Sequence, residues 1–261
     1  MMTLIVWQRL RVLLVVIFAI TGCGDGGSSA PVDEGIARQV LGDGMLSYRQ
    51  QKVDPVGIAV WFHGMDSEVA PEVRLGVNQR RFFEPFLRAK WVIVAADAEG
   101  NAFGNDPSVS AYRKLVDIAR AEYGQALPVV FLAESMGTLP ALRMYQLAEY
   151  KSVRGLVAVS PLTGIPASIQ SVDYIRGPWG GGGIPYRANP LGYPISSYGD
   201  RRFLFFYSPG DSLIPPNASA RAFASRFGKA AEVRLEVCQG GHVDPTCYRG
   251  DVAFDFVLSG S

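Results

Sequence analysis

Short apolar runs alternate with longer amphipathic stretches along most of the chain. The runs are rich in β-branched and aromatic residues and are bounded by Gly, Pro, Asn or Asp, which is typical of buried strands. They cover residues 57–64, 91–97, 128–132, 155–161, 201–208 and 231–238. The pattern predicts strands that are apolar on both faces, as in the interior of a parallel sheet.

The stretches between these runs predict helices over 78–90, from Asp106 onward, 136 to about 151, 217–227 and 250–258. Pro85 is expected to interrupt the first helix, because proline lacks an N–H and its ring collides with the preceding turn. Asp106 and Asn217 are candidate N-caps, with Pro107 at the first helical position.

Alternating strands and helices predict an α/β fold, with a doubly wound, mainly parallel sheet and helices on both faces. In such sheets the functional groups lie on loops that follow the carboxyl ends of the strands. The chain has 261 residues, which is enough for one domain with a sizeable core.

The N-terminus has a pattern of its own. Arg9 and Arg11 precede an apolar run at 12–20, and small residues lead to Cys23. A basic segment, a short apolar segment and small residues are typical of a secretory signal, and the run is too short to span a bilayer. The sequence predicts a signal peptide at 1–22, a Gly/Ser-rich tether at 23–35 and a folded domain at 36–261.

The four residues Ile20-Thr21-Gly22-Cys23 resemble the lipobox of bacterial lipoproteins. This resemblance implies that Cys23 becomes a lipidated N-terminus, so that the protein is exported and anchored to the membrane of the bacterial cell envelope. A plain signal peptide cut at another position, or a signal anchor, is the alternative.

Charge and composition exclude some classes of function. The net charge is +1 and no basic stripe is present, so nucleic acid is not expected as a partner. The chain has only two histidines, which argues against a catalytic zinc site. The acidic stretch at 97–106 lacks the ligand spacing of a calcium loop. No metal and no cofactor are therefore expected.

Two cysteines remain beyond Cys23, namely Cys238 and Cys247. In an exported protein they are expected to form a disulfide, with two free thiols as the alternative.

Candidate catalytic groups follow three of the predicted strands. Ser135 lies in Ala133-Glu134-Ser135-Met136-Gly137, Asp211 follows the fifth strand, and His242 follows the sixth. Each has a simpler interpretation: Ser135 as a helix cap, Asp211 as a turn residue and His242 as an exposed loop residue. Asp173 and Asp244 are rival carboxylates.

The order Ser, Asp, His, together with a small-x-Ser-x-Gly turn between a strand and a helix, resembles the α/β-hydrolase family. The resemblance covers residue 57 to the C-terminus, but Ala133 stands where the family has glycine. It implies that Ser135 is the nucleophile, His242 the general base and Asp211 the residue that orients the base.

The same resemblance implies an oxyanion loop and a lid. His63 and Gly64 would form the oxyanion loop, and the backbone N–H groups of Met136 and Met65 would be the oxyanion donors. The loop reads His-Gly-Met, whereas the family has His-Gly-Gly-Gly. An insert at about 162–200 would be a mobile lid, with Trp179 and Tyr186 as substrate-lining candidates. An ordered loop that packs its aromatic residues on the core is the alternative.

The expected function is an exported serine hydrolase that cleaves small-molecule or lipid-like carboxylic esters through an acyl-enzyme. A peptidase or acyltransferase with the same triad, or a surface binding protein without turnover, is the alternative. The sequence leaves the substrate and the oligomeric state open.

Overall fold

The computed structural model describes residues 35–67, 69 and 75–259. The predicted signal peptide, the lipobox with Cys23 and nearly all of the tether therefore lie outside the described residues. In the part that is described, none of the helices has the length and apolar character needed to cross a membrane.

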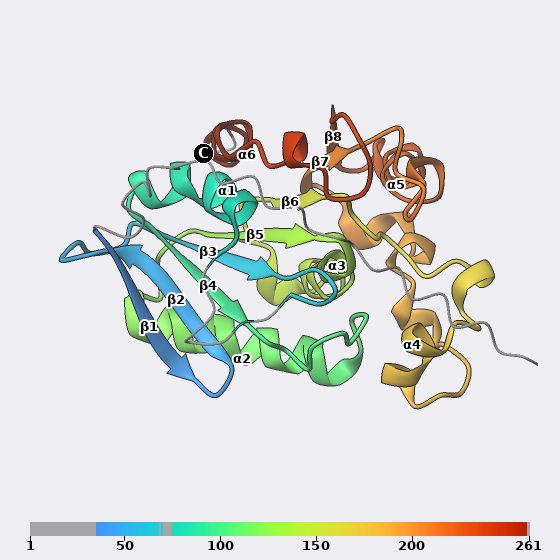
Figure 1. Cartoon of the computed structure of the whole chain (residues 1–261), viewed down its shortest axis with the longest axis horizontal. Coiled ribbons are helices and arrows are strands. Elements are labelled where there is room, and N and C mark those ends of the chain that lie inside the picture. Colours follow the sequence, from blue (N-terminus) through green and yellow to red (C-terminus); the bar gives the residue numbers. More distant parts are fainter. Residues whose placement is uncertain (1–34, 68, 70–74, 260–261) are drawn as a thin grey trace, which may run out of the picture. The chain divides into compact units, whose positions relative to one another are not determined.

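The centre of the fold is a single sheet of eight strands in the order β1-β2-β4-β3-β5-β6-β7-β8. The first two strands are antiparallel to their neighbours, and the other pairs are parallel (Figure 1). The strands are β1 (Ile36–Gly42), β2 (Met45–Gln50), β3 (Gly57–Phe62), β4 (Trp91–Ala96), β5 (Val129–Glu134), β6 (Leu156–Val159), β7 (Arg202–Tyr207) and β8 (Glu232–Val237). All six predicted strands are present as β3 to β8, whereas β1 and β2 were not predicted.

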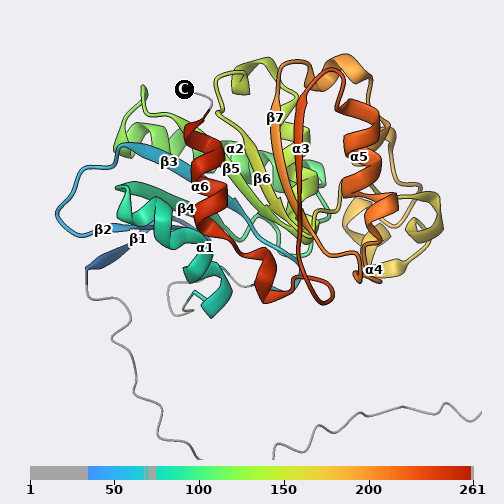
Figure 2. The ribbon, with the colours of Figure 1, turned by 90° about the horizontal axis from the view of Figure 1, so that it is seen from above.

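Helices cover both faces of the sheet, as predicted. They are α1 (Val77–Arg88), α2 (Asp106–Tyr123), α3 (Thr138–Tyr145), α4 (Asp173–Arg176), α5 (Ala220–Phe227) and α6 (Gly250–Leu258). α1 and α6 lie together on one face, and α2, α3 and α5 lie on the other (Figures 1 and 2). The sheet is therefore buried on both sides, which explains the continuous apolar runs of its central strands.

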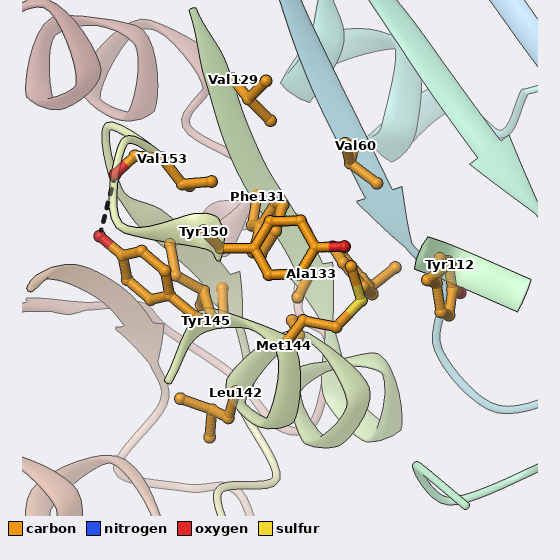
Figure 3. Close-up of a cluster of buried hydrophobic side chains, with 14 of the residues drawn as sticks. Val60, Tyr112, Val129, Phe131, Ala133, Leu142, Met144, Tyr145, Tyr150 and Val153 are labelled. Atoms are coloured by element: carbon orange, nitrogen blue, oxygen red, sulfur yellow. Dashed lines mark hydrogen bonds between the residues drawn. The ribbon is translucent and has the colours of Figure 1, made fainter. Parts of the chain in front are cut away.

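The larger core cluster lies between the sheet and α2, α3 and α5. Phe131 of β5 packs edge-to-face against Tyr145 and Tyr150, and all three side chains are buried (Figure 3). The hydroxyl of Tyr145 donates to the carbonyl of Val153 at 3.3 Å, so this polar group is satisfied inside the core. The packing fixes β5, the strand that leads to Ser135.

The predicted interruption at Pro85 is wrong, since α1 continues through this residue. Proline cannot donate to the carbonyl of Arg81, four residues earlier. That part of α1 lies against the start of α6, where a Cβ on Gly250 would collide with the carbonyls of Arg81 and Phe82. Pro85 thus lies within a continuous α1, in the turn of the helix against which the backbone of α6 packs closely.

Both predicted helix caps are also wrong. The side chain of Asn105 caps α2 by accepting from the N–H of Ser108 at 2.9 Å, and Asp106 is the first helical residue. Asn217 lies in a 3₁₀ turn (Pro216–Ala218), and α5 begins after Ser219 without a side-chain cap. Asp106 is left free to pair with arginines from other segments.

Candidate active site

The turn at Ser135 is sharp and tightly packed. β5 is buried along its length, and Ser135 opens a 3₁₀ turn (Ser135–Gly137) with a φ of 48°. This left-handed conformation is strained for a residue with a side chain. A Cβ on Gly137 would collide with the carbonyls of Phe62 and His63. Glycine at this position therefore lets the turn lie against the end of β3.

Ser135, His242 and Asp211 form a continuous chain of hydrogen bonds. Ser135 Oγ lies 2.9 Å from His242 Nε2, and His242 Nδ1 lies 2.7 Å from Asp211 Oδ2. The side chain of Asp211 is 3% exposed and that of His242 is 17% exposed. The structure thus brings together the three residues from separate loops at the carboxyl edge of the sheet.

The carboxylate of Asp211 is fixed by the backbone of its own loop. Its Oδ1 accepts from the N–H groups of Leu213 at 3.0 Å and Ile214 at 2.8 Å. Oδ2 remains directed at the histidine. The rival carboxylates are engaged elsewhere: Asp173 pairs with Arg176, and Asp244 accepts from the N–H and hydroxyl of Thr246.

The loop that carries His242 is fastened on several sides. A disulfide joins Cys238 to Cys247 around it, as predicted. The N–H of Val243 donates to Ser160 Oγ at 3.0 Å, which ties the loop to the end of β6. The hydroxyl of Ser208, after β7, donates to the carbonyl of Gly240. These contacts limit the positions that the imidazole can adopt.

A second buried carboxyl lies next to Ser135, and sequence reasoning missed its role. Glu134 is 7% exposed, and its Oε2 accepts from the hydroxyl of Tyr248 at 2.6 Å. Burial raises the pKa of Glu134, and the Tyr248 hydrogen bond and the nearby imidazoles of His242 and His63 oppose this shift. The signal in the sequence was a charged residue at the end of an otherwise apolar strand.

The ring of His63 holds the loop after β3. Its buried ring lies between the carbonyls of Gly64, at 2.7 Å from Nδ1, and Asp97, at 2.8 Å from Nε2. The side chain of Asn101 accepts from the N–H of Asp66 at 2.8 Å and braces the same turn. Met65 lies in this turn, between Gly64 and Asp66, and its side chain is 38% exposed.

An apolar cluster adjoins the turn at Ser135. Its buried members are Phe103, Met136, Leu139, Leu162, Ile165, Ile175 and Ala188. Trp179 packs against this cluster, and the guanidinium groups of Arg143 and Arg187 lie 5.5 and 5.7 Å from the centre of its ring. Residues of the 162–200 segment therefore form an apolar wall that includes Met136, the neighbour of Ser135.

This wall is joined to α2 by polar contacts. Asp106 pairs with Arg187 at 2.8 Å and with Arg143 at 2.7 Å, and these arginines, Arg187 first, lower the pKa of its carboxyl. The side chain of Asn105 donates to the carbonyl of Pro178 at 2.9 Å. The insert is thus attached, through Pro178 and Arg187, to the helix that follows β4.

The tyrosines of the insert differ in their packing. Tyr193 and Tyr198 are buried in the larger core cluster. Tyr186 is 63% exposed, packs against the ring of Tyr193, and donates its hydroxyl to the carbonyl of Gly192 at 2.6 Å. Of the two substrate-lining candidates, Trp179 lies against the wall that contains Met136, whereas the ring of Tyr186 packs on Tyr193.

No protein-family model matches the chain, and no curated protein matches it either. Solved structures resemble it in fold. Esterase 2 of Thermogutta terrifontis, phosphorylated by paraoxon, superposes with a TM-score of 0.61 at 16% identity, covering 88% of this chain and 95% of that one. For Est1E of Butyrivibrio proteoclasticus the TM-score is 0.60 at 15% identity, covering 87% and 98% of the two chains. A prolyl endopeptidase gives 0.58 at 13% identity, covering 86% of this chain and 37% of that one.

These matches cover 86–88% of this chain. At this level of identity they establish the architecture of the chain and leave its activity to the chemistry of the site. The described part of the chain has the α/β-hydrolase fold.

Proposed function

We propose that this protein is a serine hydrolase that cleaves carboxylic esters through an acyl-enzyme. The observation that carries the proposal is the chain of hydrogen bonds from Ser135 through His242 to Asp211. Serine is a weak nucleophile by itself and needs an adjacent base. A neutral imidazole with Nδ1–H directed at Asp211 presents a free lone pair on Nε2 to the serine hydroxyl.

The reaction proceeds in two stages. Ser135 Oγ attacks the ester carbonyl while His242 takes the hydroxyl proton, and the imidazolium then protonates the departing alcohol oxygen. His242 then takes a proton from water, which attacks the acyl-enzyme. As the bond to the acyl carbon breaks, the imidazolium returns this proton to Ser135 Oγ, which releases the acid and free Ser135. Asp211 holds the imidazole in the required tautomer and stabilises its charged form in both stages.

The oxyanion that forms in each stage is stabilised by backbone N–H groups. Met136 lies at the start of the helical segment after Ser135, where unpaired N–H groups and the helix dipole favour negative charge. Met65, in the turn braced by His63, supplies the second donor. The apolar wall around Met136 and Trp179 favours an uncharged, apolar acyl or alcohol group beside the reacting carbonyl.

A fluorophosphonate probe tests this function directly, because it reacts with activated serines. We expect the modified peptide, identified by mass spectrometry, to contain Ser135. Labelling should be lost in His242→Ala and retained in Ser196→Ala, which removes an exposed serine outside the triad. Absence of labelling in the oxidised, folded protein would contradict the proposal and favour a binding protein without turnover.

Substrate assays then separate esters from peptides. Turnover of short-chain aryl esters without any added acceptor supports the ester hydrolase. Cleavage of peptides in preference to esters would instead favour a peptidase, the class represented among the structural neighbours by the prolyl endopeptidase.

We also propose, from the lipobox resemblance alone, that the protein is exported and lipid-anchored through Cys23. Replacing Cys23 with serine is expected to abolish incorporation of labelled palmitate and release the protein from the membrane fraction. Unchanged membrane association and unchanged labelling would contradict this assignment.

The disulfide is expected to support both stability and activity. Removing a bridge with a sequence separation of 9 residues should lower the free energy of unfolding by about 2–3 kcal/mol, because the unfolded chain gains freedom. In Cys238→Ser/Cys247→Ser, kcat should also fall, since His242 lies inside the bridged loop. Denaturant unfolding and steady-state kinetics measure the two effects.

The matched control for this prediction is a reducing agent. It should lower kcat in the wild type and leave the double variant unaffected. An equal loss in both proteins would mean that the reductant acts elsewhere, and unchanged kcat in the double variant would show that the bridge does not position His242.

A further inference from the structure

The hydrogen bond between Glu134 and Tyr248 joins the strand that leads to Ser135 to the end of the loop that carries His242. Glu134 is the last residue of β5 and directly precedes Ser135, whereas Tyr248 directly follows Cys247, at the end of the bridged loop that carries His242. The Oε2 to hydroxyl distance is 2.6 Å, and both side chains are buried. Besides the direct hydrogen bond between Ser135 and His242, the segments that carry these two residues are therefore joined by the Glu134–Tyr248 pair.

The same carboxyl also contacts the loop after β3. A Cβ on Gly64 would collide with Glu134 Oε1, so glycine is needed there to make room for the carboxyl. Glu134 therefore lies against the oxyanion loop with one oxygen and against Tyr248 with the other. The charged or titratable groups that face it are His63 after β3, His242 in the bridged loop and Tyr248 after that loop.

Burying a carboxyl is costly unless hydrogen bonds compensate it. The other residues of β5 are apolar or small, so the packing of the strand does not require an acid at its end. Burial and the neighbouring carboxyl both raise the pKa of Tyr248, which keeps its hydroxyl protonated as the donor of this bond. The carboxyl lies between the Ser135 turn, the His242 loop and the loop after β3. This position indicates a role in the alignment of the three segments.

We propose that Glu134 is a positioning residue, which through Tyr248 holds the His242 loop in register with Ser135 and through Gly64 holds the oxyanion loop. The proposal rests on the function proposed above. Glu134 takes no part in proton transfer. Its effect is to keep His242 Nε2 within reach of the serine hydroxyl throughout the cycle.

The test uses the full-length, oxidised protein and a thermodynamic cycle of variants. Tyr248→Phe and Glu134→Leu each remove the hydrogen bond, and each should lower kcat about tenfold or more, because a buried polar group is left without its partner and the loop loses this contact. KM should change by less than about twofold, because ester binding does not use this pair. The double variant should be no slower than the slower single variant, because both changes delete the same interaction.

Two further variants separate positioning from general destabilisation. Glu134→Gln keeps an oxygen that can accept from Tyr248 and should retain kcat within about threefold of the wild type. Tyr145→Phe removes another buried hydroxyl, which donates to Val153 away from the site (Figure 3), and should leave kcat unchanged. Titration with a fluorophosphonate counts active sites, so that kcat refers to folded enzyme with a reactive serine.

The outcomes also distinguish this inference from the proposed function. An enzyme that depends on Ser135 but has unchanged kcat in Tyr248→Phe and Glu134→Leu would overturn the positioning role alone. Strictly additive losses, or losses in Glu134→Gln as large as in Glu134→Leu, would also overturn it. A wild-type protein without labelling or turnover would instead contradict the hydrolase.

Discussion

Replacing Ser135 with alanine is expected to lower kcat for ester hydrolysis by a factor of about 10⁶, as for nucleophiles of other triads. The variant has no oxygen that can form the acyl-enzyme, so only background reactivity remains. The fold should persist, because the backbone at Ser135 is held by Gly137 against β3 and not by the hydroxyl. Steady-state kinetics and a thermal melt measure the two quantities.

Ser196→Ala is the matched control for this change and should retain wild-type kcat, since the residue is exposed and lies in a 3₁₀ turn (Ile195–Tyr198) of the insert. A Ser135→Ala variant with more than about one-hundredth of the wild-type rate, well above the residual activity of disabled triads, would contradict the assignment of the nucleophile.

Asp211→Asn has the second largest expected effect, a loss of about 10⁴ in kcat. The N–H of an asparagine amide would donate to His242 Nδ1, and this favours the tautomer with the imidazole proton on Nε2. A protonated Nε2 cannot accept the hydroxyl proton of Ser135. The oxygen of the amide can still accept from the N–H groups of Leu213 and Ile214, so the loop should keep its shape. Steady-state kinetics of the purified variant test this expectation. Near-UV circular dichroism gives the fraction of folded protein to which kcat is referred.

The rival carboxylates provide the controls. Asp173→Asn and Asp244→Asn should each keep kcat within about threefold of the wild type, since Asp173 pairs with Arg176 and Asp244 with Thr246. A loss below tenfold in Asp211→Asn, together with a large loss in either control, would transfer the role of the orienting acid to that residue.

Much of the fold could be predicted because the central strands are buried on both faces and read as continuous apolar runs. β1 and β2 were missed because polar side chains interrupt their patterns. The sequence nevertheless contained a strong hairpin signal between them, Asp43-Gly44, and Gly44 adopts a φ of 62°.

The predicted helix from 136 to about 151 is shorter in the structure, where α3 ends at Tyr145 and a 3₁₀ turn (Ala148–Tyr150) follows. The guanidinium of Arg201 donates to the carbonyls of Leu147 and Tyr150 at 3.0 and 2.8 Å. These backbone groups thus find a partner some 50 residues away, which a local pattern cannot indicate.

In the candidate site, too, some residues could be predicted from the sequence and others could not. Ser135, Asp211 and His242 were found because each follows a recognisable strand, and a parallel sheet gathers such positions at one edge. The residues that hold them, such as Ser160, Ser208 and Tyr248, have no motif of their own. Their contacts depend on side-chain geometry between loops that are distant in sequence, so only the structure reveals them.

The way the insert is attached has a consequence for how the specificity of such a protein can diverge. The segment around Trp179 and Arg187 is joined to α2 through Asn105 and Asp106, whereas the His242 loop is joined to the ends of β6 and β7 and closed by its own bridge. Substitutions, or exchange of the whole segment with that of another protein, can therefore reshape the apolar wall while Ser135, His242 and Asp211 keep their spacing. In the proposed hydrolase, selection for a new ester would act first on this segment.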